Sequence, residues 1–427
     1  MQFRIKKVAV LGSGVMGSGI ACHLANVGYE VIMLDILPPK PSNNLKSDFV
    51  YRNSVARNAL DKSIKSKPSP LYKKEFAERI SIGNFEDDFS KISEVDWIIE
   101  AVLEKLEIKK SIFKKVDKYR KSGTIISSNT SSIPISKLAK DRSEDFKKYF
   151  CGTHFFNPPR YLRLLEIIPI KETSPELVRF LMSFGEVNLG KQTVICKDTP
   201  AFIANRIGVM SGIKVFELTE KYEMTIEEVD LLTGVIIGRP KTGTFRLQDL
   251  VGIDTGDKVT NFVMNNVKGD TFFEKLGKDE SPSFFKFLLK NNFLGDKTGK
   301  GFYEKTNKKD DSGRSVINAL DLKTLRYRLS SRPKIQLIKE AKGIENMSKR
   351  FEFLISKEYR ESFFLKEYFA AILSYTAHRL PEISDSLYQV DDAMRAGYFW
   401  DYGPFEYWDL IGFENAIKFI NDLGLKL

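Results

Sequence analysis

The sequence predicts an α/β domain built on a parallel sheet, followed by two related all-α domains. Three observations lead to this fold class. A glycine-rich turn joins a strand to a helix near the N-terminus, strand candidates recur up to residue 195, and a helical motif occurs twice beyond residue 200. The chain has 427 residues, of which 42% are hydrophobic and 29% charged, as is typical of a globular protein with several domains.

The first elements form a βαβ unit. Residues 7–11 are apolar and β-branched, a helical pattern runs on to Gly28, and residues 30–34 indicate a second strand that ends at Asp35. A βαβ start within about 30 residues favours a parallel sheet.

The turn inside this unit has glycine at positions 12, 14 and 17. In a Rossmann-type dinucleotide fold, the first glycine allows a tight turn, the second lets the backbone approach a pyrophosphate, and the third lets helix and strand pack closely. The pyrophosphate would lie at the positive end of the helix. Asp35 is placed to bind both ribose hydroxyls and would repel a 2′-phosphate, which favours NAD over NADP.

The rest of the α/β domain follows in order. Residues 38–41 (PPKP) break the pattern, residues 45–80 indicate a helix pair interrupted at Pro68 and Pro70, and residues 103–121 indicate a charged helix. Further strands are predicted at residues 97–102, 124–127, 150–155, 164–168 and 193–195.

A histidine and a glutamate lie on neighbouring predicted strands. His154 is near the end of strand 150–155, and Glu166 lies on the next strand, after a proline turn. Such a pair can form a base oriented by a carboxylate, which fixes the tautomer and stabilises the imidazolium. A structural histidine is the alternative, but the NAD motif and the presence of only two other histidines, His23 and His378, favour the base.

Small hydroxyl side chains follow strand 124–127, at residues 128–132 (SNTSS). Such residues commonly cap the next helix. They could equally donate to a bound oxygen at the carboxyl edge of the sheet. Taken alone, the sequence favours the cap.

The helical part contains an internal repeat. The motif Gly-x-Phe-x-x-x-Asp-Leu-x-Gly occupies residues 243–252 and recurs at 403–412, and a Val-Asp pair precedes each copy, at 229–230 and 390–391. Residues 204–207 (ANRI) are echoed by 377–380 (AHRL). This order predicts a duplicated helical domain. The predicted domains are 1–196 (NAD-binding), 197–305 (helical), 306–329 (linker) and 330–427 (second, degenerate helical copy).

Charge and cysteine usage narrow the class of protein. The net charge of +11 suits either a generally charged surface or a polyanionic ligand, and no basic-aromatic module supports nucleic-acid binding. Three cysteines without a CxxC motif argue against a disulfide framework or a metal site and for a reducing, cytoplasmic compartment. The sequence shows no apolar run of membrane-spanning length and no signal peptide, so no membrane association is expected.

Six segments together carry a family resemblance: GSGVMGSGIA, IIEAVLEKLEIKK, SSNTSSIP, GTHFFNPPRYLRLLEI, DTPAFIANRIG and GDKTGKGFYE. In this order they resemble the L-3-hydroxyacyl-CoA dehydrogenase family over about residues 5–305. The repeat beyond residue 330 resembles the second helical domain of multifunctional β-oxidation proteins. In one arrangement of those proteins an enoyl-CoA hydratase follows, so a hydratase is expected as a separate partner or as a fused domain outside these 427 residues.

The resemblance implies a role for individual residues. His154 matches the catalytic base and Glu166 its partner, while Ser131 and Asn205 match residues that hold the oxygen and thioester region of the substrate. The implied NAD contacts are Gly12, Gly14, Val15, Met16, Gly17, Asp35, Ala101, Glu104, Lys109, Ser131, Asn157 and Lys286. His378 stands where Asn205 would be in the second copy, so that copy is expected to be structural.

The implied activity is the reversible, NAD-dependent oxidation of an L-3-hydroxyacyl-CoA thioester, 3-hydroxybutyryl-CoA included, in fatty acid β-oxidation. The acyl-CoA would lie between the α/β domain and the first helical domain, and the CoA phosphates would use part of the positive charge. The two helical copies are expected to pair within the chain, giving a monomer or a homodimer. Two alternatives stay open: an NAD-dependent dehydrogenase of a free 3-hydroxy acid, and a non-catalytic NAD-binding relative such as a lens crystallin.

Overall fold

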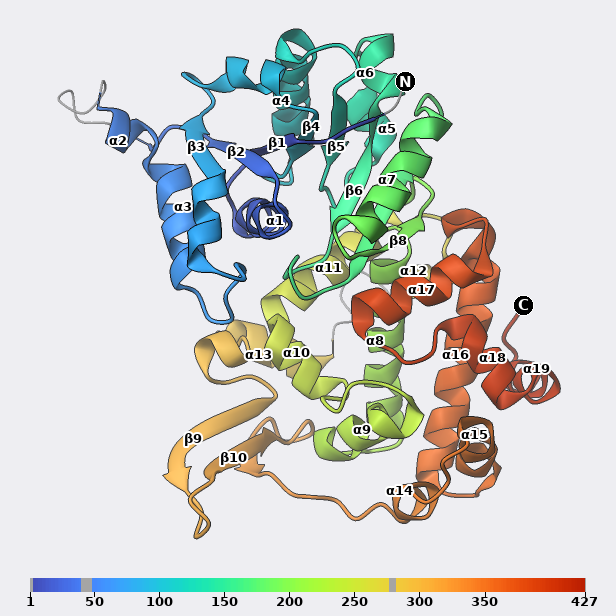
Figure 1. Ribbon diagram of the computed structural model, residues 1–427. Coiled ribbons are helices and arrows are strands. Elements are labelled where there is room, and N and C mark those ends of the chain that lie inside the picture. The colour runs from blue at the N-terminus through green and yellow to red at the C-terminus, as the bar shows by residue number, and fades with distance from the viewer. Residues whose placement is uncertain (1–2, 40–47, 276–281, 427) are drawn as a thin grey trace. The chain divides into compact units, whose positions relative to one another are not determined.

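The computed structural model describes residues 3–39, 48–275 and 282–426 (Figure 1). Contacts divide the chain into two compact units, Met1–Phe202 with Glu382–Ser384, and Ile203–Pro381 with Asp385–Leu427. Residues 45–47 of the predicted helix pair and residues 40–41 of the predicted break lie outside the described residues.

The first unit is built on one eight-stranded sheet with the strand order β3-β2-β1-β4-β5-β6-β7-β8. Every neighbouring pair from β3 to β6 is parallel, β7 runs antiparallel to β6, and β8 is parallel to β7. The strand order reverses between β1 and β4, the position at which open α/β sheets bind their ligands. The strands are β1 (Lys7–Leu11), β2 (Glu30–Asp35), β3 (Ile80–Asn84), β4 (Trp97–Glu100), β5 (Ile125–Ser128), β6 (Phe150–Phe155), β7 (Leu164–Pro169) and β8 (Gln192–Ile195).

The central strand β1 is apolar because helices cover both faces of a parallel sheet. Its residues from Val8 to Leu11 are fully buried. The α-helices of this unit are α1 (Val15–Asn26), α2 (Phe49–Arg52), α3 (Ser54–Lys65), α4 (Leu106–Tyr119), α5 (Ile135–Ala139), α6 (Glu144–Lys148) and α7 (Pro175–Val187).

The region predicted as a helix pair departs from the prediction in its second half. Helices α2 and α3 occupy the first half, whereas residues Lys74–Arg79 form a 3₁₀ helix that leads into β3. Strand β3 is short, and its buried Ile80 is followed by an exposed Ser81. This alternation is too brief to stand out within a region of helical periodicity.

The second unit is mainly helical. Its helices are α8 (Ala204–Lys221), α9 (Ile226–Leu232), α10 (Phe245–Val251), α11 (Ile253–Asn266), α12 (Thr271–Lys275), α13 (Ser283–Lys290), α14 (Gln336–Ala341), α15 (Met347–Ser356), α16 (Arg360–Ile383), α17 (Leu387–Tyr398), α18 (Pro404–Ile411) and α19 (Phe413–Asp422).

The stretch predicted as a linker contains a three-stranded antiparallel sheet, β9 (Tyr303–Lys309), β10 (Ser315–Leu320) and β11 (Tyr327–Leu329) (Figure 1). The polar residues between β9 and β10 form the tip of a hairpin. There the Asp310 carboxylate accepts hydrogen bonds from the amides of Ser312 and Arg314. A polar, glycine-containing tip has the same composition as a linker, so the two are hard to separate by sequence.

The two copies of the helical motif share one local geometry. Oδ1 of Asp230 accepts a hydrogen bond from the amide of Phe245 at 2.6 Å, and Oδ1 of Asp391 accepts one from the amide of Phe405 at 2.8 Å. In each copy the glycine two residues before the phenylalanine lies so close to the aspartate that a Cβ would be 2.3 Å from its Cα. The Val-Asp pair and the Gly-x-Phe block are therefore two halves of one packed unit, as a duplication requires.

Residues of the two copies contact each other inside the second unit. The guanidinium of Arg206 binds Asp270 and the hydroxyl of Tyr375, each at 2.9 Å, and all three side chains are buried. The buried guanidinium of Arg239 lies 3.6 Å from the ring centre of Trp400. The two helical copies therefore pack against each other within one chain, and a chain without the second copy would lose these contacts.

Candidate cofactor and catalytic site

The glycine turn after β1 has the geometry that a pyrophosphate needs. Gly12 has a φ of +104°, and a Cβ there would lie 2.6 Å from the carbonyl oxygen of Ala101. A Cβ at Gly17 would lie 1.9 Å from the carbonyl oxygen of Gly12, so α1 can begin this close only with glycine. A Cβ at Gly14, by contrast, would meet nothing within 4 Å.

This open side of the turn coincides with the first residues of α1. Gly14 is the N-cap of α1 and provides no side-chain hydrogen bond to the first helical amides. Val15 is 71% exposed, and Met16 follows it in the first turn. Uncapped amides at a helix N-terminus bind anions, so these residues fit a dinucleotide pyrophosphate.

Asp35 lies beside this turn, at the carboxyl end of β2. Its Oδ2 accepts hydrogen bonds from the amide and the hydroxyl of Ser13, both at 2.5 Å, and its Oδ1 accepts one from the amide of Ile36 at 2.7 Å. A half-buried carboxylate held in this way can accept hydrogen bonds from ribose hydroxyls. The residues of the turn and Asp35 therefore fit NAD.

A buried ion pair lies where β4 ends. Nζ of Lys109 on α4 is 2.6 Å from Oε1 of Glu100, and Oε2 of Glu100 accepts a hydrogen bond from the hydroxyl of Ser128 at 2.6 Å. Burial raises the pKa of Glu100, and the charge of Lys109 opposes that rise. Sequence reasoning missed Glu100, although an acid inside the apolar run 97–102 was a usable signal.

The hydroxyl loop 128–132 binds a second carboxylate, Glu104. Glu104 accepts hydrogen bonds from the hydroxyls of Thr130 and Ser132 and, at 3.2 Å, from the amide of Ser131. Burial alone would raise the pKa of Glu104, but Lys109, 3.1 Å away, and the two hydroxyls lower it. Glu104, Lys109 and Ser131 thus form one polar cluster at the edge of β4 and β5.

The capping interpretation of this loop is wrong. The first amides of α5, those of Ile135 and Ser136, donate to the carboxylate of Asp198 at 2.7 and 2.9 Å. The serines and threonine are bound to Glu100 and Glu104 instead, which leaves them at the carboxyl edge of the sheet.

His154 and Glu166 pair directly across β6 and β7. Nδ1 of His154 is 2.6 Å from Oε2 of Glu166, the glutamate is fully buried, and His154 is 5% exposed. A proton on Nδ1 directed at the carboxylate leaves Nε2 as the ring atom that can accept a proton. The rings of Phe156 and Phe202 lie 4.7 and 5.5 Å from the imidazole centre and keep its surroundings apolar.

The remaining predicted residues divide between the two units. Asn157 is exposed just after β6. Asn205 and Lys286 belong to the second unit, at the start of α8 and on α13. Within that unit the hydroxyl of Tyr398 on α17 is 3.5 Å from Oδ1 of Asn205, and His378 is exposed on α16.

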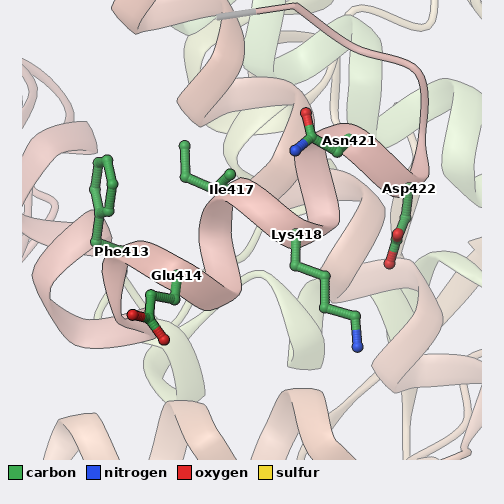
Figure 2. A pocket seen from close by; sticks show the side chains of 6 residues that line it. All are labelled: Phe413, Glu414, Ile417, Lys418, Asn421 and Asp422. Atoms are coloured by element: carbon green, nitrogen blue, oxygen red, sulfur yellow. The ribbon is translucent and has the colours of Figure 1, made fainter.

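Two open hollows lie apart from these residues. Figure 2 shows the first, along one face of α19, where the side chains of Phe413 and Ile417 stand beside charged groups. It is lined by Phe413, Glu414, Ile417, Lys418, Asn421 and Asp422. The second, on the first unit, is lined by Lys114, Asp117, Lys118, Arg120, Ser122, Arg142, Ser143 and Asp145. Neither contains a predicted site residue.

All three cysteines are free and buried, and burial raises the pKa of Cys22 to about 11 and of Cys151 to about 12. Over residues 3–39, 48–275 and 282–426, the structure contains no helix with the length and hydropathy of a membrane span.

Comparison with known proteins gives two family matches. The model of the 3-hydroxyacyl-CoA dehydrogenase NAD binding domain matches residues 7–199, and that of the 3-hydroxyacyl-CoA dehydrogenase C-terminal domain matches residues 202–305. A protein of Bacillus subtilis named "Probable 3-hydroxyacyl-CoA dehydrogenase" is 44% identical over all of this chain and 54% of its own length. A protein of Deinococcus radiodurans with the same name is 44% identical over 73% of this chain and 85% of its own length.

A solved structure agrees in fold. The crystal structure of 3-hydroxybutyryl-CoA dehydrogenase from Escherichia coli superposes with a TM-score of 0.68 at 21% identity, and it covers 99% of this chain and 94% of its own. The chain spans about half the length of the Bacillus subtilis relative (54%).

Proposed function

The chain belongs to the 3-hydroxyacyl-CoA dehydrogenase family, and on that premise we propose that it oxidises an L-3-hydroxyacyl-CoA to the 3-oxoacyl-CoA, reversibly and with NAD. The observation that carries the proposal is the buried His154–Glu166 pair. It lies on the same sheet as a glycine turn and an aspartate that fit NAD.

His154 acts as the base in this proposal. Its Nε2 takes the proton from the 3-hydroxyl group, the C3–O bond becomes a carbonyl, and the hydride leaves C3. NAD⁺ supplies the hydride acceptor. The carboxylate of Glu166 holds the ring and stabilises the imidazolium, which returns its proton when the reaction runs in reverse.

The other site residues bind and orient. Ser131 holds the substrate oxygen, and Asn205 binds the thioester region. The nicotinamide half is contacted by Ala101, Glu104, Lys109 and Asn157. Of these, Glu104 and Lys109 form an ion pair, and Glu104 also binds the amide of Ser131. Gly12, Gly14, Val15, Met16 and Gly17 bind the pyrophosphate, Asp35 binds the adenosine ribose, and Lys286 is a further cofactor contact.

The substrate class and partners belong to the same proposal. We propose an acyl-CoA thioester, with 3-hydroxybutyryl-CoA as one candidate, a cytoplasmic location, and an enoyl-CoA hydratase as partner or fused domain. The internal contacts between the helical copies favour a monomer or a homodimer.

The test is NADH oxidation driven by acetoacetyl-CoA and by longer 3-oxoacyl-CoA substrates, with free acetoacetate in parallel. The expected result is turnover with the thioesters only. His154→Gln should lower kcat by roughly 10²–10⁴, the usual worth of a positioned acid–base group. His378→Gln, at an exposed histidine, is the matched control. Turnover only with free acetoacetate would favour the free-acid alternative, and NADH binding without turnover would favour the non-catalytic one.

A further inference from the structure

We propose that Lys191 is a positioning residue for the acid–base pair, because its ammonium group holds the turn between β6 and β7 through two main-chain carbonyls. This proposal rests on the proposed function, since the turn matters to catalysis only if His154 is the base.

Lys191 precedes β8 and is 4% exposed. Its Nζ donates hydrogen bonds to the carbonyl oxygens of Pro159 and, at 2.7 Å, of Leu162. Both acceptors are uncharged, and a buried ammonium without a carboxylate partner is costly to the fold. What the ammonium provides, and an apolar side chain could not, is two donors for carbonyls of the turn.

The charged and titratable groups that face Lys191 are Arg163 and His23, and neither is acidic. Burial and the nearby charge of Arg163, on the turn itself, lower the pKa of Lys191 to about 8. From α1 the facing group is His23, whose pKa is lowered to about 3 by burial and then by the charge of Lys191. Neither neighbour supplies a negative charge, so the ammonium is stabilised by the two carbonyls and, more weakly, by the ring of Phe155, whose centre is 5.9 Å from Nζ.

Other contacts hold the outer side of the same turn. The guanidinium of Arg160 donates to the carbonyls of Ser69 and Leu71 at 2.6 and 2.9 Å. Pro159 packs so closely on α1 that a Cβ at Gly19 would lie 3.0 Å from its ring. Lys191 holds the inner side of the turn. The next residue, Gln192, begins β8 and its amide donates to the carbonyl of Arg163 at 2.8 Å, so β8 fixes the position of Lys191.

The direction of the strands explains why the hydrogen bonds of Lys191 can affect the position of His154 and Glu166. Because β7 and β8 run opposite to β6, the start of β8 lies at the edge where β6 ends. The turn, residues 156–163, joins the strand of His154 to the strand of Glu166 and contains Asn157. A shift of about 1 Å in a positioning element is enough to slow a reaction roughly 10²-fold.

The experiment compares Lys191→Met, which removes the charge, with Lys191→Arg, which keeps it. Lys171→Met, at an exposed lysine just beyond β7, is the second control. Two quantities are measured: kcat and KM for NADH-driven reduction of acetoacetyl-CoA, and amide hydrogen exchange of residues 156–163 in the cofactor-free protein. Exchange in α7 reports on general stability.

In Lys191→Met we expect kcat to fall at least about tenfold with KM for the thioester within about threefold, and exchange in 156–163 to rise at least about tenfold while α7 is unchanged. Lys191→Arg should recover part of the kcat, and Lys171→Met should match the wild type. A wild-type kcat in Lys191→Met, unchanged exchange in the turn, or an equal rise in α7 would each overturn the proposal.

If Lys191→Met does not fold, Lys191→Gln takes its place, because its amide is uncharged and its nitrogen, one bond nearer the main chain than Nζ, cannot reach far enough to keep both carbonyl contacts. A wild-type kcat and unchanged exchange in that variant would overturn the proposal in the same way. Failure of the proposed function looks different: the wild type itself would not turn over 3-oxoacyl-CoA, while the exchange measurement would still report whether Lys191 holds the turn.

Discussion

Nδ1 of His154 lies 2.6 Å from Oε2 of Glu166, and the two residues are direct partners in the β6–β7 register. Because side chains alternate between the faces of a sheet, a slip of one residue would turn Glu166 to the opposite face. The acid–base geometry is therefore set by main-chain pairing rather than by a flexible loop.

Glu166→Gln should keep this pairing but remove the charge that stabilises the imidazolium. We expect kcat to fall at least about tenfold, because an amide can also present its NH₂ group and favour the wrong tautomer. Steady-state rates with acetoacetyl-CoA measure the effect. Glu172→Gln, at an exposed glutamate beyond the end of β7, is the control, and equal rates in both variants would argue against a role for Glu166.

His23 should make the fold sensitive to acid. It is 3% exposed, its Nε2 is 3.0 Å from the carbonyl oxygen of Leu189, and burial lowers its pKa to about 3. Between pH 6.5 and 3 the unfolded chain binds the proton and the folded chain does not. The contribution of a neutral His23 is therefore full above pH 6.5 and is lost as the pH falls.

From pH 6.5 to pH 5 this loss is roughly 2 kcal/mol in the free energy of unfolding. Urea unfolding at the two pH values measures it. His23→Gln should show a flatter dependence, whereas His378→Gln, at an exposed position, should keep the wild-type slope. Identical slopes in wild type and His23→Gln would mean that His23 does not carry the effect.

Asp35 should set the cofactor preference. Its carboxylate beside Ser13 would lose its ribose hydrogen bonds and repel a 2′-phosphate, so kcat/KM should be higher with NADH than with NADPH. Asp35→Ser combined with Ile36→Arg, at an exposed neighbour, should reduce the difference. Glu30→Gln, at the other end of β2, is the control. Equal kcat/KM values for the two cofactors in the wild type would contradict the prediction.

Deleting residues 333–427 should destabilise the second unit while leaving every proposed site residue in the chain. The cut follows β11 and removes Tyr375 and Trp400, so the buried guanidinium of Arg206 keeps Asp270 but loses the Tyr375 hydroxyl, and that of Arg239 loses the Trp400 ring. We expect association or aggregation in light scattering and a lower Tm. A monomeric truncation with an unchanged Tm would show that the first helical copy does not need the second.

The sequence predicted the parts of the site that have short, local signatures. The glycine turn, Asp35, and the pairing of His154 with Glu166 all lie within or between adjacent elements, where spacing alone is informative. Glu100 and Lys191 were missed because their importance comes from burial and from which carbonyls or cations they meet. Strands β9 to β11 were missed because a polar hairpin has the composition of a linker.

The antiparallel return of β7 also has a consequence for how the chain folds. Chain entropy lost on closing a loop grows with the logarithm of loop length. His154 and Glu166 are 12 residues apart, whereas β1 must find β4 across most of the first hundred residues, where Leu11 meets Glu100. Pairing His154 with Glu166 therefore costs much less chain entropy than pairing β1 with β4. The hairpin that carries this pair can form before the sheet that will hold the cofactor is complete.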